Sequence, residues 1–172
     1  MTALHGAGFI LEPIRVSHAK GLFPVLSEPG LYQFIENPAP KTEEDLELRF
    51  KRWEAGASPD GSELWLNWAI RLDDQELVGH VQATVLSGAT SWVAYMLSQR
   101  HWGKGLGRAA TGLMIHHLIS QHQCKTLLAC VERANQRSIA LLQALSFVQG
   151  APAEHAAHQL SDSEALFVYR AE

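Results

Sequence analysis

The sequence has few cysteines, no long hydrophobic run and no excess of positive charge. Its two cysteines, Cys124 and Cys130, lie six positions apart on what reads as one strand, so they cannot pair unless that strand bends. No apolar stretch approaches the ~20 residues of a membrane span, and Met1–Phe9 lacks the basic and apolar regions of a signal peptide. We therefore expect reduced, buried thiols in a cytoplasmic protein that has no membrane partner.

The net charge is −4 at neutral pH, so a nucleic acid is not expected as a partner. Hydrophobic residues make up 47% of the chain and charged residues 19%, a balance typical of globular proteins and not of disordered ones. With 172 residues the chain is long enough to bury a hydrophobic core. We expect a single domain over residues 1–172, as a monomer or a homodimer.

The pattern of apolar residues predicts strands and helices that alternate in the second half of the chain. Strands are expected at 9–15, 64–72, 77–86, 91–97, 125–131, 147–148 and 166–170. Helices are expected from Ser17 to Leu26, from Thr42 to the residue before Gly56, and at 105–121 and 136–145. Hairpins followed by strand–helix–strand–helix units predict one mixed α/β sheet with helices on both faces. Strands 91–97 and 125–131 should be parallel neighbours, joined by a right-handed crossover through the helix at 105–121.

A glycine-rich turn between a strand and a helix is the most informative segment. Gly103, Gly105 and Gly107 leave backbone N–H groups uncovered, close to the positive end of the dipole of the following helix. This arrangement is suited to an anion such as a pyrophosphate. Lys104 and Arg108 flank the turn and can add charge-assisted contacts.

Three other interpretations of this turn compete. A P-loop is excluded because its lysine is followed by Ser or Thr, whereas Lys104 is followed by Gly105. A dinucleotide-binding oxidoreductase fits the spacing Gly105-x-Gly107-x-x-Ala110, with Glu132 as the ribose-binding acid, but seven residues separate Leu97 from Gly105. A purely structural glycine turn stays open.

Two motifs resemble those of a known family. Residues 102–107 (WGKGLG) are similar to the motif Gln/Arg-x-x-Gly-x-Gly/Ala of the GCN5-related (GNAT) N-acetyltransferases, with Trp102 in place of the leading Gln or Arg. Residues 135–147 (NQRSIALLQALSF) are similar to the Asn-x-x-Ser, helix, Leu-Gly-Phe signature of the ribosomal-protein N-terminal acetyltransferase-like branch, with Ser146 in place of the glycine. The segments LEPIR, LFPVL and PGLY also resemble this branch, so the resemblance covers nearly the whole chain.

The resemblance implies the GNAT fold, with one central, mixed, mostly antiparallel sheet of about seven strands. It also implies that strands 91–97 and 125–131 diverge at their carboxyl ends. It also implies acetyl-coenzyme A as cofactor, bound by Met96, Leu97, Trp102, Gly103, Lys104, Gly105, Leu106, Gly107, Arg108, Ala109, Asn135 and Ser138. The backbone of Tyr95, Met96 and Leu97 is expected to face the pantetheine and the reacting carbonyl. No metal is expected, because His116, His117 and His122 share a helix but adjacent residues face different directions.

The resemblance names Ser138 as the group that protonates or orients the leaving thiolate, and a helix-capping hydroxyl is the alternative. Tyr95 and Glu132 complete the catalytic candidates. The general base is left open between Glu132, which can also be a solvated strand-end charge, and His80, which can also be a half-buried strand histidine.

The acceptor is expected to be a primary amine of a small molecule or of a protein N-terminus. The acidic balance mildly favours a cationic acceptor, and four tryptophans are expected around the cleft: Trp65, Trp68, Trp92 and Trp102. A GNAT fold that binds acyl-coenzyme A without turnover is the alternative function.

Overall fold

The computed structural model describes residues 1–171 and contains one eight-stranded sheet with the strand order β1-β2-β3-β4-β5-β6-β8-β7. The strands are β1 (Leu4–Gly6), β2 (Phe9–Pro13), β3 (Leu64–Leu72), β4 (Leu77–Leu86), β5 (Thr90–Leu97), β6 (Thr126–Glu132), β7 (Val148–Gln149) and β8 (Glu164–Arg170). The helices are α1 (Ala19–Leu26), α2 (Glu43–Glu54), α3 (Leu106–His122), α4 (Gln136–Ala144) and α5 (Pro152–Ala157), with short 3-10 turns at Val16–His18, Pro29–Tyr32 and Gln99–His101.

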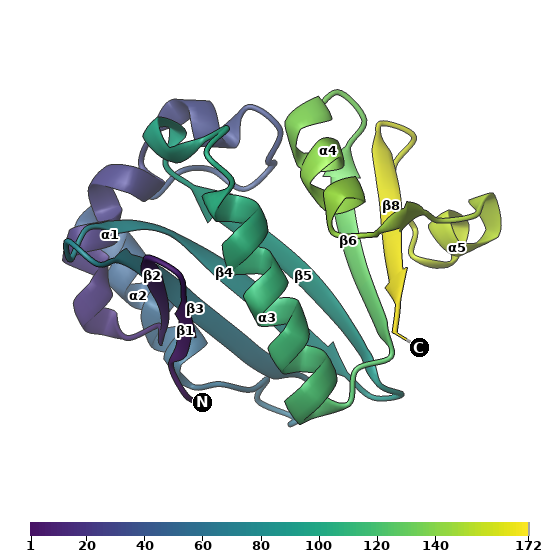
Figure 1. The fold of residues 1–172 in the computed structure, drawn as a ribbon, viewed down its shortest axis with the longest axis horizontal. Coiled ribbons are helices and arrows are strands. Elements are labelled where there is room, and N and C mark those ends of the chain that lie inside the picture. Colours follow the sequence, from purple (N-terminus) through teal and green to yellow (C-terminus); the bar gives the residue numbers. More distant parts are fainter. Residues whose placement is uncertain (172) are drawn as a thin grey trace.

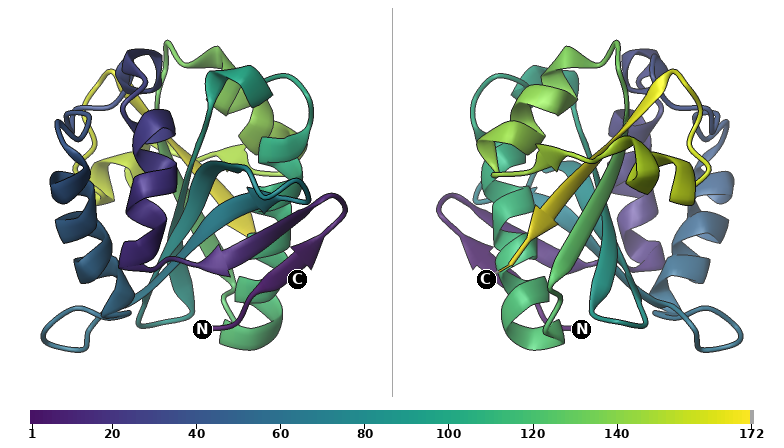
Figure 2. Two further views of the ribbon diagram at one scale, coloured as in Figure 1. Left: turned by 90° about the vertical axis from the view of Figure 1, so that its left-hand side faces the viewer. Right: turned by 90° about the vertical axis from the view of Figure 1, so that its right-hand side faces the viewer.

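Helices cover both faces of the sheet, as the sequence predicts (Figures 1 and 2). The helices α1 and α2 pack on one face, and α3 and α4 lie on the other. All strand pairs are antiparallel except β5 with β6. No helix in residues 1–171 is long and apolar enough to cross a bilayer.

The start of α2 follows directly from its sequence. Thr42 is the N-cap, and its side chain accepts a hydrogen bond from the Asp45 N–H at 3.2 Å while the Asp45 carboxylate accepts one from the Thr42 N–H. A Thr followed three residues later by an acidic residue in the sequence predicts this reciprocal capping box at the start of the helix. Three acidic residues in the first turn and two basic residues in the last turn also match the helix dipole.

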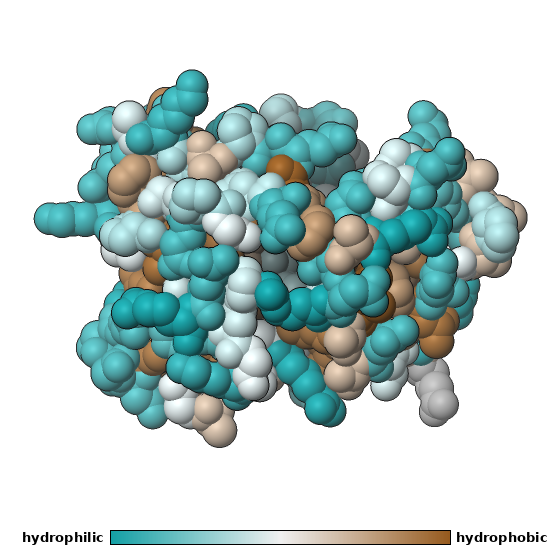
Figure 3. Space-filling view, turned by 90° about the horizontal axis from the view of Figure 1, so that it is seen from above, coloured by the Kyte–Doolittle hydropathy of each residue, from teal (hydrophilic) through white to brown (hydrophobic). Residues whose placement is uncertain are grey.

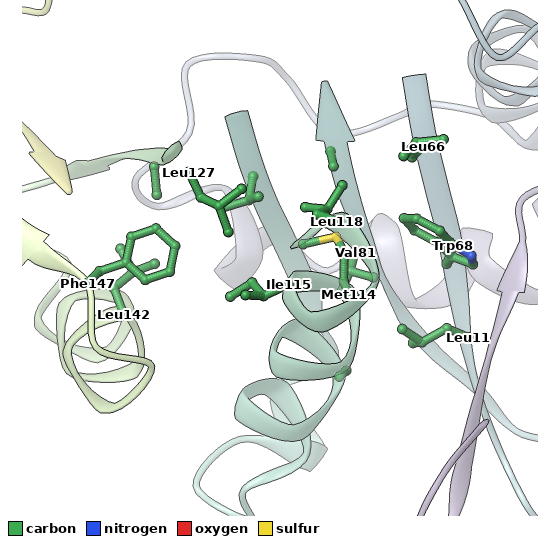
Figure 4. Packing of buried hydrophobic residues seen from close by; sticks show 14 of the residues in the cluster. Leu11, Leu66, Trp68, Val81, Met114, Ile115, Leu118, Leu127, Leu142 and Phe147 are labelled. Atoms are coloured by element: carbon green, nitrogen blue, oxygen red, sulfur yellow. The ribbon is translucent and has the colours of Figure 1, made fainter. Parts of the chain in front are cut away.

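The main hydrophobic core lies between the sheet and α3 (Figure 4). Met114 and Leu118 of α3 are fully buried and point toward Val81 and Trp68 of the sheet. On the opposite face, a second cluster under α1 and α2 includes the fully buried Phe50. Both faces of the central strands are therefore apolar, and each face is covered by a pair of helices.

The strands β5 and β6 separate soon after they meet (Figure 1). Thr90, Ser91 and Trp92 pair with Thr126, Leu127 and Leu128, and the parallel pairing ends there. The predicted divergence is confirmed. Beyond Trp92 the strands β5 and β6 are no longer paired, so the sheet is open between β1–β5 on one side and β6, β8 and β7 on the other. The candidate functional residues described below lie around this opening.

Several local expectations need correction. The edge strand β1 and the short helix α5 were not predicted, and α1 has His18 as its N-cap residue, not Ser17. Cys124 precedes β6 and is buried, but Cys130 lies within β6 and is exposed. The expectation of two buried thiols on one strand is therefore wrong, because β6 begins only at Thr126.

Candidate active site

The glycine turn opens α3 with its backbone N–H groups accessible. Gly103 and Gly105 have φ angles of +71° and +81°, which L-residues with a side chain rarely adopt, and a Cβ at either position would meet open space. Gly105 is the N-cap of α3, and the N–H of Ala109 donates to its carbonyl at 3.0 Å. The preceding N–H groups of the first turn have no intrahelical acceptor. The residues present therefore fit a pyrophosphate.

Trp102 fixes the turn against β5. Its indole Nε1 donates to the Leu97 carbonyl at 2.7 Å, and the guanidinium carbon of Arg137 lies 3.5 Å from the centre of its ring. A cation over an indole face is attracted by the ring. The residue that departs from the family motif thus anchors the turn to the end of β5 and positions a cation from α4.

A cavity of about 360 Å³ lies between the end of β5, the glycine turn and α4. Of the residues predicted to bind the cofactor, it is lined by Met96, Leu97, Trp102, Gly103, Gly105, Gly107, Arg108, Asn135 and Ser138. Lys104, Leu106 and Ala109 do not line it: Lys104 and Ala109 are exposed, and Leu106 packs against the core.

Gly107 differs from the other two glycines. A Cβ at this position would lie 3.2 Å from Leu141 Cδ1 of α4. The absent side chain therefore gives room for packing between α3 and α4, whereas Gly103 and Gly105 leave backbone groups open.

Figure 3 looks down on the end of the molecule that contains the glycine turn. It shows mostly hydrophilic residues with smaller hydrophobic areas between them.

Ser138 lies on α4 beside Tyr95 of β5. The Tyr95 hydroxyl is 2.7 Å from Ser138 Oγ, and it also donates to the Ser138 carbonyl at 3.2 Å. The cap of α4 comes from Asn135, whose side-chain oxygen accepts from the Ser138 N–H at 3.2 Å. The side chain that caps α4 is thus that of Asn135, and the Ser138 hydroxyl contacts Tyr95 at the wall of the cavity. Burial raises the pKa of Tyr95 to about 12, with the hydrogen bond to Ser138 opposing this, so the phenol stays protonated at neutral pH.

A second cavity, of about 620 Å³, lies on the α2 side of the sheet. It shares Ile35, Tyr95, Met96, Asn135 and Ser138 with the first, so the two cavities adjoin at the opening between β5 and β6. Among the predicted residues, Glu132 lines this second cavity only. One space faces the glycine turn and the other faces α2, with the Tyr95–Ser138 pair between them.

His80 also lines the second cavity, but it is fully buried and not half-buried as expected. Its ring lies 5.2 Å from that of Trp53, and its Nδ1 has no hydrogen-bond partner in residues 1–171. Burial and, to a smaller extent, the charge of Arg49 lower the pKa of His80 to about 4, with a hydrogen bond to Gln82 opposing them. The imidazole is thus neutral at pH 7 and a weak base.

Cys130 lines the same cavity beside two carboxylates. Its thiol donates to Glu164 Oε1 at 3.0 Å. Burial, the hydrogen bond to Glu164 and the charges of Glu164 and Glu132 raise the pKa of Cys130 to about 12. The thiolate form is therefore negligible at neutral pH.

The expected group of four tryptophans does not form. Trp68 is buried in the core, Trp92 packs against His158 with ring centres 5.0 Å apart, and neither these two nor Trp65 lines either of the two cavities. Of the four, Trp102 lines the first cavity. Trp65 and Trp68 are three positions apart on β3, so their side chains point to opposite faces of the sheet. Within residues 1–171, no three His, Cys, Asp or Glu side chains lie close enough to hold a metal ion.

The sequence interpretation missed the contribution of α2 to the second cavity. Arg49, Arg52 and Trp53 line it. Their spacing of three and four places them on one helix face, and this was visible in the sequence. The spacing alone does not reveal which part of the molecule that face contacts.

The sheet is open between β5 and β6, a cavity lies at this opening, and a glycine turn begins the helix beside it. This arrangement fits a group donor that carries phosphates. The family profile of the acetyltransferase (GNAT) domain matches residues 9–148, and the chain belongs to this family of acetyltransferases. The family uses acetyl-coenzyme A, and the first cavity has the residues for it. No curated protein matches the chain in sequence.

Solved structures share the fold over almost the whole chain. A GNAT-family acetyltransferase from Bacillus anthracis has 12% identity and a TM-score of 0.79, with 98% of each chain covered. The ribosomal-protein-S5-alanine acetyltransferase from Vibrio fischeri has 16% identity and a TM-score of 0.78, with coverage of 99% of this chain and 97% of that one. The ribosomal L7/L12 alpha-N-protein acetyltransferase RimL in complex with coenzyme A has 14% identity and a TM-score of 0.79, with coverage of 98% and 97%. At these identities the similarity shows the fold.

Proposed function

We propose that the protein transfers the acetyl group of acetyl-coenzyme A to a primary amine of a small molecule or a protein N-terminus, by direct attack in a ternary complex. The observation that carries the proposal is the pair of adjoining cavities, which meet at Tyr95 and Ser138. A donor on one side of the pair and an acceptor on the other can meet within the opening of the sheet. Holding two reactants in this way converts a bimolecular reaction into a unimolecular one.

On the donor side, we assign the backbone N–H groups of the glycine turn to the pyrophosphate, supported by Arg108 at the cavity wall. When bound, acetyl-coenzyme A supplies an acetyl group activated as a thioester. Asn135 orients Ser138 by capping the first turn of α4, and Met96 and Leu97 line the path between turn and opening.

On the acceptor side, Glu132 lies in the second cavity and is the proposed acceptor of the proton that the ammonium form must lose. The free amine nitrogen then forms a bond to the acetyl carbonyl carbon, and the bond from that carbon to sulfur breaks. Tyr95 and Ser138 would protonate or orient the departing thiolate, and the proton that the nitrogen releases as the amide forms replaces the one that the pair gives up. Either hydroxyl can donate, because the Tyr95 phenol keeps its proton at neutral pH and lies 2.7 Å from Ser138 Oγ.

A screen of amine acceptors with acetyl-coenzyme A, following release of the free thiol, tests the proposal. We expect thiol release that depends on the acceptor, with a product heavier by one acetyl group in mass spectrometry. Tight binding of acetyl-coenzyme A with no release for any acceptor would support a non-catalytic acyl-coenzyme A-binding module instead. Stronger binding of NADH than of acetyl-coenzyme A would support a dinucleotide site.

A further inference from the structure

The second cavity contains positive charge that the proposed transfer does not use. Arg49 and Arg52, one helical turn apart on α2, both line it. Neither guanidinium forms an ion pair with a carboxylate among residues 1–171, although five other basic side chains do. Arg49 is half-buried, and a partly desolvated guanidinium without a carboxylate is unusual unless a ligand supplies one.

Arg49 lines the same cavity as two residues at the opening of the sheet. His80 pairs directly with Met96 across β4 and β5, and Met96 lines both cavities. Burial lowers the pKa of His80 and raises that of Tyr32, and the charge of Arg49 acts on both groups as well. The positive charge of Arg49 therefore belongs to the cavity that meets the donor side at Met96.

Two of the three acidic side chains that line the cavity come from the far strands of the sheet, and the third, Glu36, comes from the loop 32–38. Glu132 and Glu164 project from β6 and β8, beyond β5 in the strand order, whereas α2 packs on β3. The cavity therefore has a positive wall at α2 and a negative wall at β6 and β8. A polycation is disfavoured at the first wall, and an ammonium group is favoured at the second.

We propose that the acceptor is a primary amine that carries a carboxylate a few bonds from its nitrogen, and that Arg49, with Arg52, binds this carboxylate. The inference rests on the proposed acetyl transfer. Two arginines and three glutamates, Glu36, Glu132 and Glu164, line the cavity, so a zwitterion matches the separated charges better than a dianionic phosphate does. A planar guanidinium also matches a carboxylate with two parallel hydrogen bonds. This specificity is opposite to the cationic acceptor that the net charge of the chain favours.

Two sources supply this chemistry: a free α-amino acid, and a peptide with an acidic residue next to its N-terminus. The test measures kcat/KM with acetyl-coenzyme A for matched pairs that differ only in charge. One arm compares free α-amino acids with their α-carboxamides, and the other compares alanyl tripeptides with aspartate or asparagine at the second position. Spermidine and phosphoethanolamine represent a polycation and a phosphate-bearing amine.

In one of the two arms, we expect kcat/KM for the carboxylate acceptor to exceed kcat/KM for its amide by about 10- to 100-fold. This is the range of a charge-assisted hydrogen bond. Arg49→Gln should remove this preference, and Arg49→Lys should keep part of it. Lys51→Gln makes the same change of charge on an exposed position of α2 outside the cavity, and it should keep the preference in full.

Equal rates for acid and amide in the wild type would overturn the inference, as would spermidine or phosphoethanolamine as the best acceptor. So would an Arg49→Gln variant that binds acetyl-coenzyme A normally and still prefers the acid. In each of these results thiol release continues, so the proposed function stands. No thiol release with any acceptor would instead overturn the proposed function, and the inference with it.

Discussion

The two cavities of the site are built in different ways. The cavity at the glycine turn is formed mainly by two short stretches of chain, residues 95–108 and 135–141, and much of its chemistry comes from the backbone. The cavity at α2 is formed by side chains from the loop 32–38 and from α2, β4, β5, β6 and β8. The first depends on conformation within a contiguous motif. The second depends on the packing of distant elements.

This difference explains why the donor is evident and the acceptor is not. A turn that needs left-handed backbone at Gly103 and Gly105 leaves a glycine pattern in the sequence. A cavity wall that needs Arg49 near His80 leaves no pattern, because the two residues are 31 positions apart in the chain. Substitutions should therefore act differently on the two cavities, and the following predictions test that contrast.

The largest effect is expected where the cavities meet. Ser138→Ala should fold normally and bind acetyl-coenzyme A, yet lose about 10²- to 10⁴-fold in the chemical step, the usual contribution of an acid. Tyr95→Phe should act similarly, and the double variant should lose less than the product of the two, because the hydroxyls act as one unit. Single-turnover rates with a good acceptor measure this. A Ser138→Ala rate within about threefold of wild type, ~0.65 kcal/mol of barrier, would remove Ser138 from the catalytic residues.

Asn135→Ala is the matched control for Ser138. It removes the side-chain cap of α4, which is worth about 1 kcal/mol of stability. A thermal melt should show a lower Tm for Asn135→Ala and an almost unchanged Tm for Ser138→Ala. The opposite order of melting temperatures would assign the capping role to Ser138.

A smaller but still large effect is expected at the glycine turn. Gly105→Val places a branched side chain where the pyrophosphate must approach, and acetyl-coenzyme A affinity should fall by about 100-fold or more, ~2.7 kcal/mol. Gly8→Val is the control, because Gly8 has the same φ of +81° and equally open surroundings in the hairpin of β1 and β2. Both variants should lose similar stability, and only the first should lose affinity in calorimetric titration.

Lys104→Ala tests whether the backbone or the side chains of the glycine turn bind acetyl-coenzyme A. Lys104 is exposed and does not line the cavity, so its removal should change acetyl-coenzyme A affinity by only a few-fold. If it weakened binding as much as Gly105→Val does, side chains and not the backbone would carry the donor site.

A further prediction concerns the pH dependence of stability at the α2 cavity. The pKa of His80 is about 4 in the folded protein against its ordinary value of 6.5, so the unfolded chain binds the proton first as the pH falls. Stability is therefore complete above about pH 6.5 and declines toward pH 4. Between pH 7 and pH 5 the loss from this group is about 2 kcal/mol. Urea unfolding of wild type and of His80→Gln at both pH values measures it. An equal loss in both proteins would show that other groups cause the decline.

Much of the fold is predictable because local signals agree with tertiary packing. The capping box at Thr42, the hairpin strands and the split of β5 from β6 all follow from the sequence. The three-residue strand β1 was missed because it is too short to show alternation. Helix α5 was missed although Pro152 at its first turn and Glu154 three residues after Ala151 are start signals. Its six residues were read as loop.

The candidate site divides in the same way. The residues of the glycine turn could be chosen from their spacing, and the pair Asn135 and Ser138 from the resemblance to the Asn-x-x-Ser signature. The burial of His80 and the place of Arg49 could not, because each depends on which helix packs above β4. Sequence periodicity indicates that a face exists, whereas three-dimensional packing decides what that face meets.

The three paired residues that join β5 to β6 have a consequence for how the molecule opens. They leave β6, β8, β7 and α4 attached to the rest of the sheet by a short hinge, with α3 as the covalent link. Regions with few cross-links exchange amide hydrogens by local opening at low free energy. A donor molecule bound between β5 and β6 would contact both parts of the sheet and hold them together. Bound at 100 times its Kd, it would add ~2.7 kcal/mol to the closed state, and slowed hydrogen exchange in β5 and β6 would report that closure.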